Sequence, residues 1–520
     1  AILKAPVDLL WFGGIGTYVR GAGETNADVG DRANDAIRIT GAEVRAKVVG
    51  EGANLGMTQR GRIEYALAGG RCNSDAIDNS AGVNSSDVEV NIKIALAPAM
   101  RKGSLTRDAR NKLLSQMTDE VAALVLANNY EQTLALSLAR ARGAADLAHL
   151  ERFMQALEVR GLLDRTVESL PSTGAVADRA ARGEGLTRPE LGVLLAYAKL
   201  ALFDDLVSGP LPDEPYLEAD LFSYFPAKMA KKFGEEIRAH PLRREIIATV
   251  LANDVINRGG PSFITRLQDL SGRTASDVVA AYVVVSEGFE LPALFRQIDV
   301  LDNSIDGTAQ LELYQAVGRL IHAATLWQLR HGDAAAPLAE RIAALRSARK
   351  TLQPHLAAKV PAQTVEFVDQ KLREIAETGG PEELATRLAW LPIEELIPDI
   401  ALLAAQAKAE LRAAARAFFA VTEEFRIGRI NEAARAIQPA DYYDGLALAR
   451  AIETMNSARR GLARAALVAY PKDREPVTKW VEAGGERVAR TREQLQALTE
   501  AGELTVSRLT VASGLMADLG

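Results

Sequence analysis

The chain has 520 residues, of which 48% are hydrophobic and 25% are charged. This is the composition of a globular protein with room for about two to four domains, not of a disordered or fibrous chain. Its formal net charge of −7 gives no overall attraction to polyphosphate or to an anionic membrane, so we expect neither nucleic acid nor a membrane as a partner.

Cysteine content and the N-terminal sequence indicate the cellular compartment in which the protein is expected. The single cysteine, Cys72, excludes an internal disulfide framework and is typical of a reducing compartment, so we expect a cytoplasmic protein. No apolar run approaches the roughly 20 residues that span a bilayer, and residues 1–20 lack the pattern of a targeting segment. A buried-strand pattern at Val7–Trp11 follows Ala1 closely, and we therefore expect the chain to begin within a fold.

The first part of the chain, residues 1–97, is rich in glycine among short apolar runs. The patterns predict strands at Val7–Trp11 and Ala46–Val49, a helix at Thr58–Ala68, and a short strand near Asp75. This alternation is typical of βαβ units, in which parallel strands are joined by a helix.

The second part, residues 98–520, has the apolar spacing of successive amphipathic helices. Thr106 is a predicted helix cap, residues 187–190 form a predicted capping box before another helix, and Pro241 opens a third that stops at Gly259-Gly260. The stretches 208–215 and 331–338 contain proline or glycine and are candidate joints within this helical region.

Three turns could carry chemistry because each follows a predicted strand. A glycine-rich turn at 12–17 would let the backbone approach a ligand closely, although a purely structural turn is an equal alternative. The turn Glu51-Gly52-Ala53-Asn54 ends in an amide that can donate and accept, yet asparagine is also a common turn residue. Residues 75–86 are dense in polar groups; the alternative there is a solvated loop with Ser85 or Ser86 capping the next helix.

The order and spacing of these segments match a known pattern: a strand and turn, then Glu-Gly-Ala-Asn, then Asn-x-x-Gly-Val with a serine seven positions after the asparagine. The matching residues are Glu51-Gly52-Ala53-Asn54, Asn79, Gly82, Val83 and Ser86. The chain thus resembles the large, bacterial-type, NAD-specific glutamate dehydrogenases. The resemblance continues at residues 61–65, 186–192 and 240–245, and weakens after about residue 350.

The resemblance implies an α/β region followed by an all-α region. Residues 1–97 would be the C-terminal half of a Rossmann-like NAD-binding domain, and residues 98–520 a large helical C-terminal region. Asn54 and Asn79 would contact the nicotinamide-ribose end of NAD, and Gly13 and Gly14 would line the cofactor cleft. The Ser86 hydroxyl, expected to be buried, would bind the side-chain carboxylate of glutamate and so select glutamate over apolar amino acids.

The activity implied by the resemblance is oxidative deamination of L-glutamate to 2-oxoglutarate and ammonium with formation of NADH, in a homo-oligomer. The catalytic lysine and aspartate of the family lie upstream of this part of the cofactor domain, so we assign no catalytic acid or base to this chain. Two departures from the shorter glutamate dehydrogenases are the glycine-rich turn at 12–17 and Asp87, which stands next to the proposed carboxylate contact.

No metal site is expected, because the histidines have no HxxxH or HExxH spacing and the cysteine is isolated. The histidines are His149, His240, His322, His331 and His355. Arginine-rich helical segments such as residues 457–464 favour a solvated face or a subunit contact over nucleic acid. Two alternative functions remain: a non-catalytic helical scaffold with a degenerate half cofactor domain, and a dehydrogenase of another amino acid.

Overall fold

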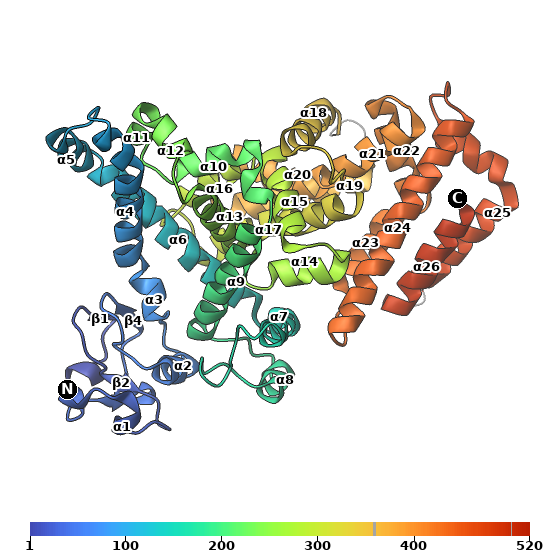
Figure 1. Ribbon diagram of the computed structural model, residues 1–520. Helices are drawn as coiled ribbons and strands as arrows, with labels where there is room; N and C mark the ends of the chain where they lie inside the picture. Colours follow the sequence, from blue (N-terminus) through green and yellow to red (C-terminus); the bar gives the residue numbers. More distant parts are fainter. Residues whose placement is uncertain (357–359, 501) are drawn as a thin grey trace. The chain divides into compact units, whose positions relative to one another are not determined.

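The computed structural model describes residues 1–356, 360–500 and 502–520. These form two compact units (Figure 1): Ala1–Asp269 with Arg273–Ala280, and Leu270–Gly272 with Ala281–Gly520. The candidate functional residues all lie in the first unit.

The strands of the described residues form two parallel pairs in the first unit. β1 (Leu9–Phe12) pairs with β4 (Val48–Glu51), and β2 (Val19–Arg20) pairs with β3 (Ile39–Thr40). Both strands predicted before residue 50 are confirmed, each displaced about two residues toward the C-terminus. β2 and β3 were not predicted, since two residues are too few to show the alternation of a strand.

The helix after β4 begins and ends as predicted. In α2 (Gln59–Leu67) the hydroxyl of Thr58 accepts a hydrogen bond from the backbone of Gly61 at 3.0 Å, which satisfies one of the unpaired donors of the first turn. The chain leaves the helix at Gly69, where φ is +96°, a conformation that favours glycine.

The prediction of a strand near Asp75 is wrong. This segment is the short helix α3 (Asp75–Asp78), and the parallel pairing beside β4 is a single bridge between Val48 and Arg71. Aspartates favour helix starts and local turns over sheet interiors. Here the carboxylate of Asp78 accepts the backbone N–H of Glu51, the last residue of β4, and that of Asp75 accepts the N–H of Leu55 in the loop after it.

Helices make up most of the remaining chain (Figure 1). In chain order they are α1 (Asn26–Val29), α4 (Ser80–Arg101), α5 (Arg107–Gln116), α6 (Thr118–Arg142), α7 (Leu147–Val159), α8 (Thr173–Ala181), α9 (Arg188–Ser208), α10 (Glu218–Ser223), α11 (Ala227–Lys232), α12 (Gly234–Arg238), α13 (Arg243–Gly259), α14 (Phe263–Ser271), α15 (Ala275–Gly288), α16 (Leu291–Asp299), α17 (Gly307–His331), α18 (Leu338–Leu356), α19 (Ala362–Glu377), α20 (Glu382–Glu394), α21 (Ile397–Ala407), α22 (Leu411–Glu424), α23 (Ile427–Ala436), α24 (Tyr442–Ala469), α25 (Pro476–Glu500) and α26 (Val506–Leu519).

The predicted helix starts are largely confirmed. Thr106 caps α5, and Thr187 and Glu190 form the capping box of α9. The helix predicted from Pro241 begins at Arg243 and gives way to Gly260, where φ is +93°. α4 runs across residue 97, and the domain division predicted there stays a prediction.

Each unit contains helices packed against one another. In the first, α4 packs on α6, and α9 packs on both α6 and α13. In the second, α24 packs against α21, α22, α25 and α26 around a large apolar cluster. Among the described helices no single one is long and apolar enough to cross a membrane, and the consecutive pair α15 and α16, which together would qualify by length and composition, is bent by 69°.

Candidate functional site

The candidate site lies where β1 and β4 end. The two strands are parallel, with Phe12 opposite Glu51, so their carboxyl ends share one sheet edge, the edge at which parallel α/β sheets bind ligands. The loops that follow are joined there, because the backbone N–H groups of Gly52 and Ala53 both donate to the carbonyl of Phe12, at 2.9 and 3.0 Å.

Two glycines in and after β4 are required by the neighbouring strand. A Cβ atom at Gly50 would lie 2.7 Å from the ring of Trp11, and one at Gly52 would lie 2.3 Å from it. The indole therefore covers the β4 backbone, while Trp11 itself remains 58% exposed. Gly50 and Gly52 thus allow the backbone in and after β4 to pack closely against an aromatic ring.

The structure brings Asn54 and Asn79 together, although they are 25 residues apart. The Asn79 amide nitrogen donates to the side-chain oxygen of Asn54 at 3.0 Å. This bond uses one amide atom of each residue and leaves a nitrogen donor on Asn54 and an oxygen acceptor on Asn79. A Cβ atom at Gly82 would lie 2.9 Å from that oxygen, which explains why glycine stands three residues after Asn79.

Gly13 and Gly14 line a cavity of about 800 Å³ beside the end of β1. Apolar side chains form much of its wall, among them Trp11, Tyr18 and Ile37. A Cβ atom at Gly14 would meet nothing within 4 Å. The packing of the chain therefore does not by itself require glycine at this position, and the space that a side chain would fill is open to a ligand.

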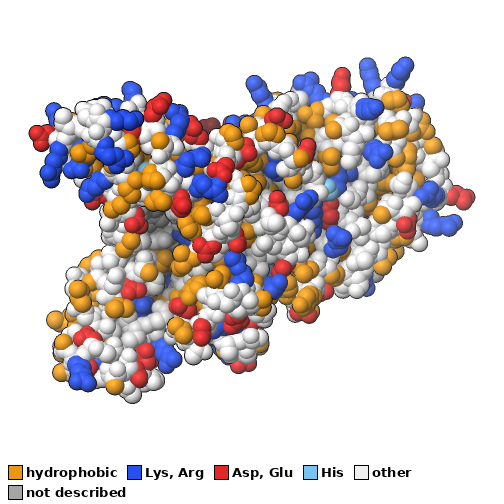
Figure 2. Space-filling model, viewed as in Figure 1, with side chains coloured by type: hydrophobic (Ala, Val, Ile, Leu, Met, Phe, Trp, Pro, Cys, Tyr) orange, Lys and Arg blue, Asp and Glu red, His pale blue; other side chains and the backbone are white. Residues whose placement is uncertain are grey.

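Ser86 lies in α4 and is exposed, whereas the sequence predicted a buried hydroxyl. Seven residues separate it from Asn79, about two helical turns, so both face the same side of the helix. Val83 and Val90 share this face and are 62% and 48% exposed. Figure 2 shows hydrophobic side chains over α4 and over the strand-bearing part, on either side of a hollow. Asp87 is also exposed.

A buried ion pair supports the loop after β4. The guanidinium of Arg62 donates to both carboxylate oxygens of Glu51, at 2.6 and 2.9 Å, and reaches Asp75 at 3.3 Å. Glu51 is 1% exposed and Arg62 is 4% exposed. Burial raises the pKa of Glu51, and the hydrogen bonds from Arg62 oppose that rise. Glu51 therefore has a structural partner, which the sequence did not reveal because Arg62 lies eleven positions away in a different element.

The short helix α3 holds the same loop from its other side. The carboxylate of Asp78 accepts the backbone N–H of Glu51 at 3.0 Å, and that of Asp75 accepts the N–H of Leu55 at 2.9 Å. Leu55 has a φ of +62°, which is unfavourable for leucine and needs support from its surroundings. Burial raises the pKa of Asp78, and the hydrogen bonds from Asn73 and from Glu51 oppose it.

Comparison with known proteins places this site in a family. Residues 1–139 match the family described as bacterial NAD-glutamate dehydrogenase, catalytic domain, and residues 183–518 match glutamate dehydrogenase, C-terminal. The chain belongs to the bacterial NAD-specific glutamate dehydrogenase family. The candidate site thus lies within the part that matches the catalytic domain, and α9 onward within the C-terminal part.

Three curated relatives are named NAD-specific glutamate dehydrogenase. The chain is 47% identical to that of Pseudomonas aeruginosa over 81% of its length, and 42% identical to that of Halomonas elongata over 75%. It is 36% identical to that of Mycobacterium tuberculosis over 99% of its length. The aligned parts cover 26%, 24% and 32% of these relatives, so the chain spans about a quarter to a third of the glutamate dehydrogenases it matches.

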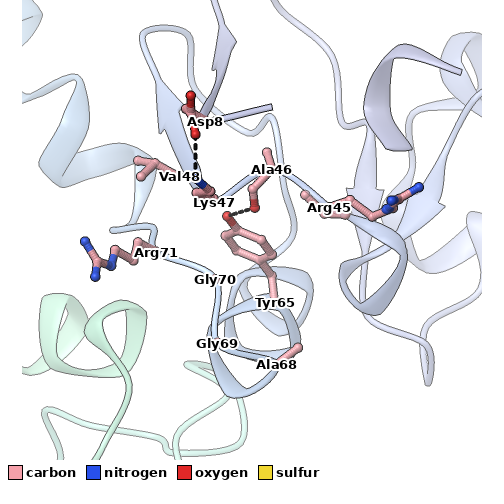
Figure 3. A pocket seen from close by; sticks show the side chains of 11 residues that line it. Asp8, Arg45, Ala46, Lys47, Val48, Tyr65, Ala68, Gly69, Gly70 and Arg71 are labelled. Atoms are coloured by element: carbon pink, nitrogen blue, oxygen red, sulfur yellow. Dashed lines mark hydrogen bonds and ion pairs between the residues drawn. The ribbon is translucent and has the colours of Figure 1, made fainter. Parts of the chain in front are cut away.

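A second cavity, of about 490 Å³, lies at the opposite end of the strands (Figure 3). Tyr65 lies at its centre and donates its hydroxyl to the carbonyl of Ala46 at 2.7 Å, and Lys47 pairs with Asp8 at 2.8 Å. The cavity lies beside the start of β4, away from the carboxyl ends. Arg71 points away from the tyrosine ring (Figure 3), so the basic groups do not converge on a ligand.

Histidines in the described part of the chain have structural partners. His240 approaches the carbonyl of Asn91 in α4 at 3.2 Å through Nε2, and its Nδ1 accepts the backbone N–H of Leu242 at 3.0 Å. His331 lies 2.9 Å from Glu453. No group of three or more potential metal ligands occurs among the side chains described; the side chain of His355 lies outside them.

Proposed function

We propose that this chain supplies cofactor and substrate contacts of an NAD-dependent glutamate dehydrogenase. The reaction is oxidative deamination of L-glutamate to 2-oxoglutarate and ammonium. NAD, when bound, supplies the acceptor for the hydride that leaves the glutamate α-carbon. Membership of the family supports this reaction class, and the geometry at the carboxyl ends of β1 and β4 supports the place of the cofactor.

The paired amides of Asn54 and Asn79 are the observation that carries the proposal. Their mutual hydrogen bond of 3.0 Å fixes two groups side by side, one presenting a donor and the other an acceptor. A carboxamide or a ribose hydroxyl pair needs both kinds of partner. We assign the nicotinamide-ribose end of NAD to this amide pair, and the cleft beside Gly13 and Gly14 to the same cofactor.

The residues of this chain would bind NAD and glutamate and orient them for the reaction. The buried pair of Glu51 and Arg62 keeps the loop in place, so that Asn54 meets the cofactor without reorganisation. Ser86, on the same face of α4 as Asn79, would donate a hydrogen bond to the side-chain carboxylate of glutamate. Because an apolar amino acid would leave that hydroxyl without its charged partner, Ser86 would favour glutamate. We assign no catalytic acid or base.

We infer that residues 1–97 are the C-terminal half of a Rossmann-like NAD-binding domain, supported by the parallel pairing of β1 with β4 and by α2 directly after β4. Residues 98–520 would form the helical C-terminal region, with joints at 208–215 and 331–338. We further propose a cytoplasmic homo-oligomer.

Substrate-dependent reduction of NAD tests the function. The natural polypeptide that contains this chain is assayed with glutamate, leucine and phenylalanine, as wild type, Ser86→Ala and Ser85→Ala. The control is closely matched, since Ser85 is also exposed in α4 but donates to the carbonyl of Ala81 at 2.7 Å. Loss of one hydrogen bond to a charged group predicts a fall of about 10- to 100-fold in kcat/KM for glutamate in Ser86→Ala, with Ser85→Ala near wild type.

The outcomes separate the candidate functions. Glutamate-dependent formation of NADH that falls selectively in Ser86→Ala supports both the reaction and the carboxylate contact. Preference for leucine or phenylalanine would favour a dehydrogenase of another amino acid. Absence of NAD reduction with any amino acid would favour a non-catalytic helical scaffold.

A further inference from the structure

Arg188 lies at the start of α9, and its side chain forms hydrogen bonds with α6 and with the segment before α3. Its guanidinium donates to the Asn73 side-chain oxygen at 2.9 Å, to the Ser137 hydroxyl at 2.9 Å and to the Thr133 carbonyl at 3.4 Å. All three acceptors are neutral. Burial lowers the pKa of Arg188, with Asp78 the strongest opposing influence. An arginine placed among neutral acceptors gains less stability than one in an ion pair, which points to a role beyond anchoring α9.

The side-chain amide of Asn73 connects Arg188 to Asp78. The Asn73 oxygen accepts from Arg188, so its amide nitrogen must face the other way, and it donates to the Asp78 carboxylate at 2.8 Å. The donor on one side therefore fixes which amide atom meets the acid on the other. Without Arg188 the amide could turn over and place its oxygen against the carboxylate, which is repulsive.

Asp78 connects Asn73 to Glu51, at the start of the segment from Glu51 to Asn54. Its second carboxylate oxygen accepts the backbone N–H of Glu51 at 3.0 Å, the first residue of the segment that carries Asn54. A second link between the same parts supports this path, since the Gln59 amide of α2 donates to the carbonyl of Pro189 at 3.1 Å. The start of α9 is thus linked to both sides of the loop after β4, to Glu51 through Asn73 and Asp78 and to Gln59 directly.

We infer that Arg188 is a positioning residue for the segment from Glu51 to Asn54, here called the cofactor loop. Through Asn73 and Asp78 it fixes the position of this loop relative to the nicotinamide end of NAD. This inference rests on the proposed function. It links the helical C-terminal part of the family fold, where Arg188 lies, to the cofactor edge of the catalytic part. The function of the Thr187–Glu190 segment is then both to cap α9 and to orient the loop.

A purely structural role predicts a different result. If Arg188 only holds α9 to α6, its loss lowers the thermal midpoint and leaves the kinetic constants of the folded enzyme unchanged. If it positions the loop, its loss raises KM for NAD more than KM for glutamate. The comparison uses Arg165, an arginine whose hydrogen-bond partners lie outside α3 and outside the loop after β4. Arg165 is 8% exposed and donates to Glu151 and Glu158 at 2.8 and 2.9 Å.

The experiment compares four variants in the natural polypeptide: Arg188→Gln, Asn73→Ala, the double variant, and Arg165→Gln. KM for NAD, KM for glutamate, kcat and the thermal midpoint are measured for each. We expect KM for NAD to rise about 10-fold in Arg188→Gln and in Asn73→Ala, because each loses one hydrogen bond to a charged group. The double variant should be no more than about two-fold worse than either single one, because both break the same path.

Two results would overturn the inference. One is a KM for NAD in Arg188→Gln that stays within two-fold of wild type while the thermal midpoint falls as in Arg165→Gln. The other is multiplication of the two single effects in the double variant. If Arg188→Gln does not fold, Asn73→Ala decides alone through the ratio of the two KM values. A wild-type enzyme that does not reduce NAD with glutamate overturns the proposed function, and the inference falls with it.

Discussion

Removing Arg62 should destabilise the cofactor part strongly, because it leaves the Glu51 carboxylate buried without its partner. The two side chains are 4% and 1% exposed, and two hydrogen bonds of 2.6 and 2.9 Å join them. Removing one member of a buried ion pair costs about 3–5 kcal/mol. Arg62→Met should lose this amount, and the double variant with Glu51→Gln should recover part of it, since the more deeply buried of the two carboxylates that Arg62 contacts is then uncharged.

The thiol of Cys72 reports this loss locally. It is the single cysteine in the 520-residue chain, it is buried, and it lies 3.7 Å from the carbonyl of Arg62. Burial raises the pKa of Cys72 to about 12, so reaction with a disulfide reagent near neutral pH requires local opening. A loss of 3–5 kcal/mol corresponds to a rate increase from about 100-fold to several thousand-fold.

The control is Arg60→Met, an exposed arginine on the same helix, which should change the rate less than about three-fold. A rate in Arg62→Met within ten-fold of wild type would refute the reasoning. A double variant whose thiol reacts faster than that of Arg62→Met would also refute it, because neutralising Glu51 would then have restored no local stability.

Three further predictions concern single residues. Alanine at Gly82 would place its Cβ 2.9 Å from the Asn79 amide oxygen, so titration of NADH should show affinity reduced about 10-fold, although alanine favours the helix and calorimetry should show no loss of stability. Burial raises the pKa of Glu453, but His331 and the neighbouring arginines outweigh burial and lower this pKa to about 2. Stability that Glu453 contributes above pH 4.5 is therefore lost as the pH falls toward 2, and denaturant titrations should give Glu453→Gln a flatter pH profile by on the order of 2 kcal/mol. Burial lowers the pKa of His149 to about 4, so the unfolded chain binds the proton first as the pH falls from 6.5 to 4, and thermal melts should lose stability over that range in wild type more than in His149→Gln.

Local signals in the sequence were enough to find β1, β4 and α2, but not α3. The hydroxyls of Thr58 and Thr187 cap their helices as expected, because capping depends on residues within one turn. Asn54 and Asn79 meet, as expected of two residues that the family resemblance assigns to the same end of NAD. The caps are local, whereas the amide pair depends on α3, whose aspartates accept hydrogen bonds from Glu51 and Leu55.

Interactions between distant segments could not be read from the sequence. Nothing local distinguishes Arg62, whose partner Glu51 lies in another element, or Arg188, whose partner Asn73 is 115 positions away. The aspartates of α3 were read as part of a strand end, and their role appears only when the loop after β4 is seen to donate to them. Ser86 was expected to be buried, but in this chain nothing described covers that face of α4.

We propose that the amide pair of Asn54 and Asn79 binds the nicotinamide end of the cofactor. Titration of NADH fluorescence with the natural polypeptide, as wild type, Asn54→Ala, Asn79→Ala and the double variant, tests this assignment. Each single variant should weaken binding about 10-fold, and the double variant should fall short of the product because the two amides act as one unit. A Kd within two-fold of wild type in all three variants would contradict the claim.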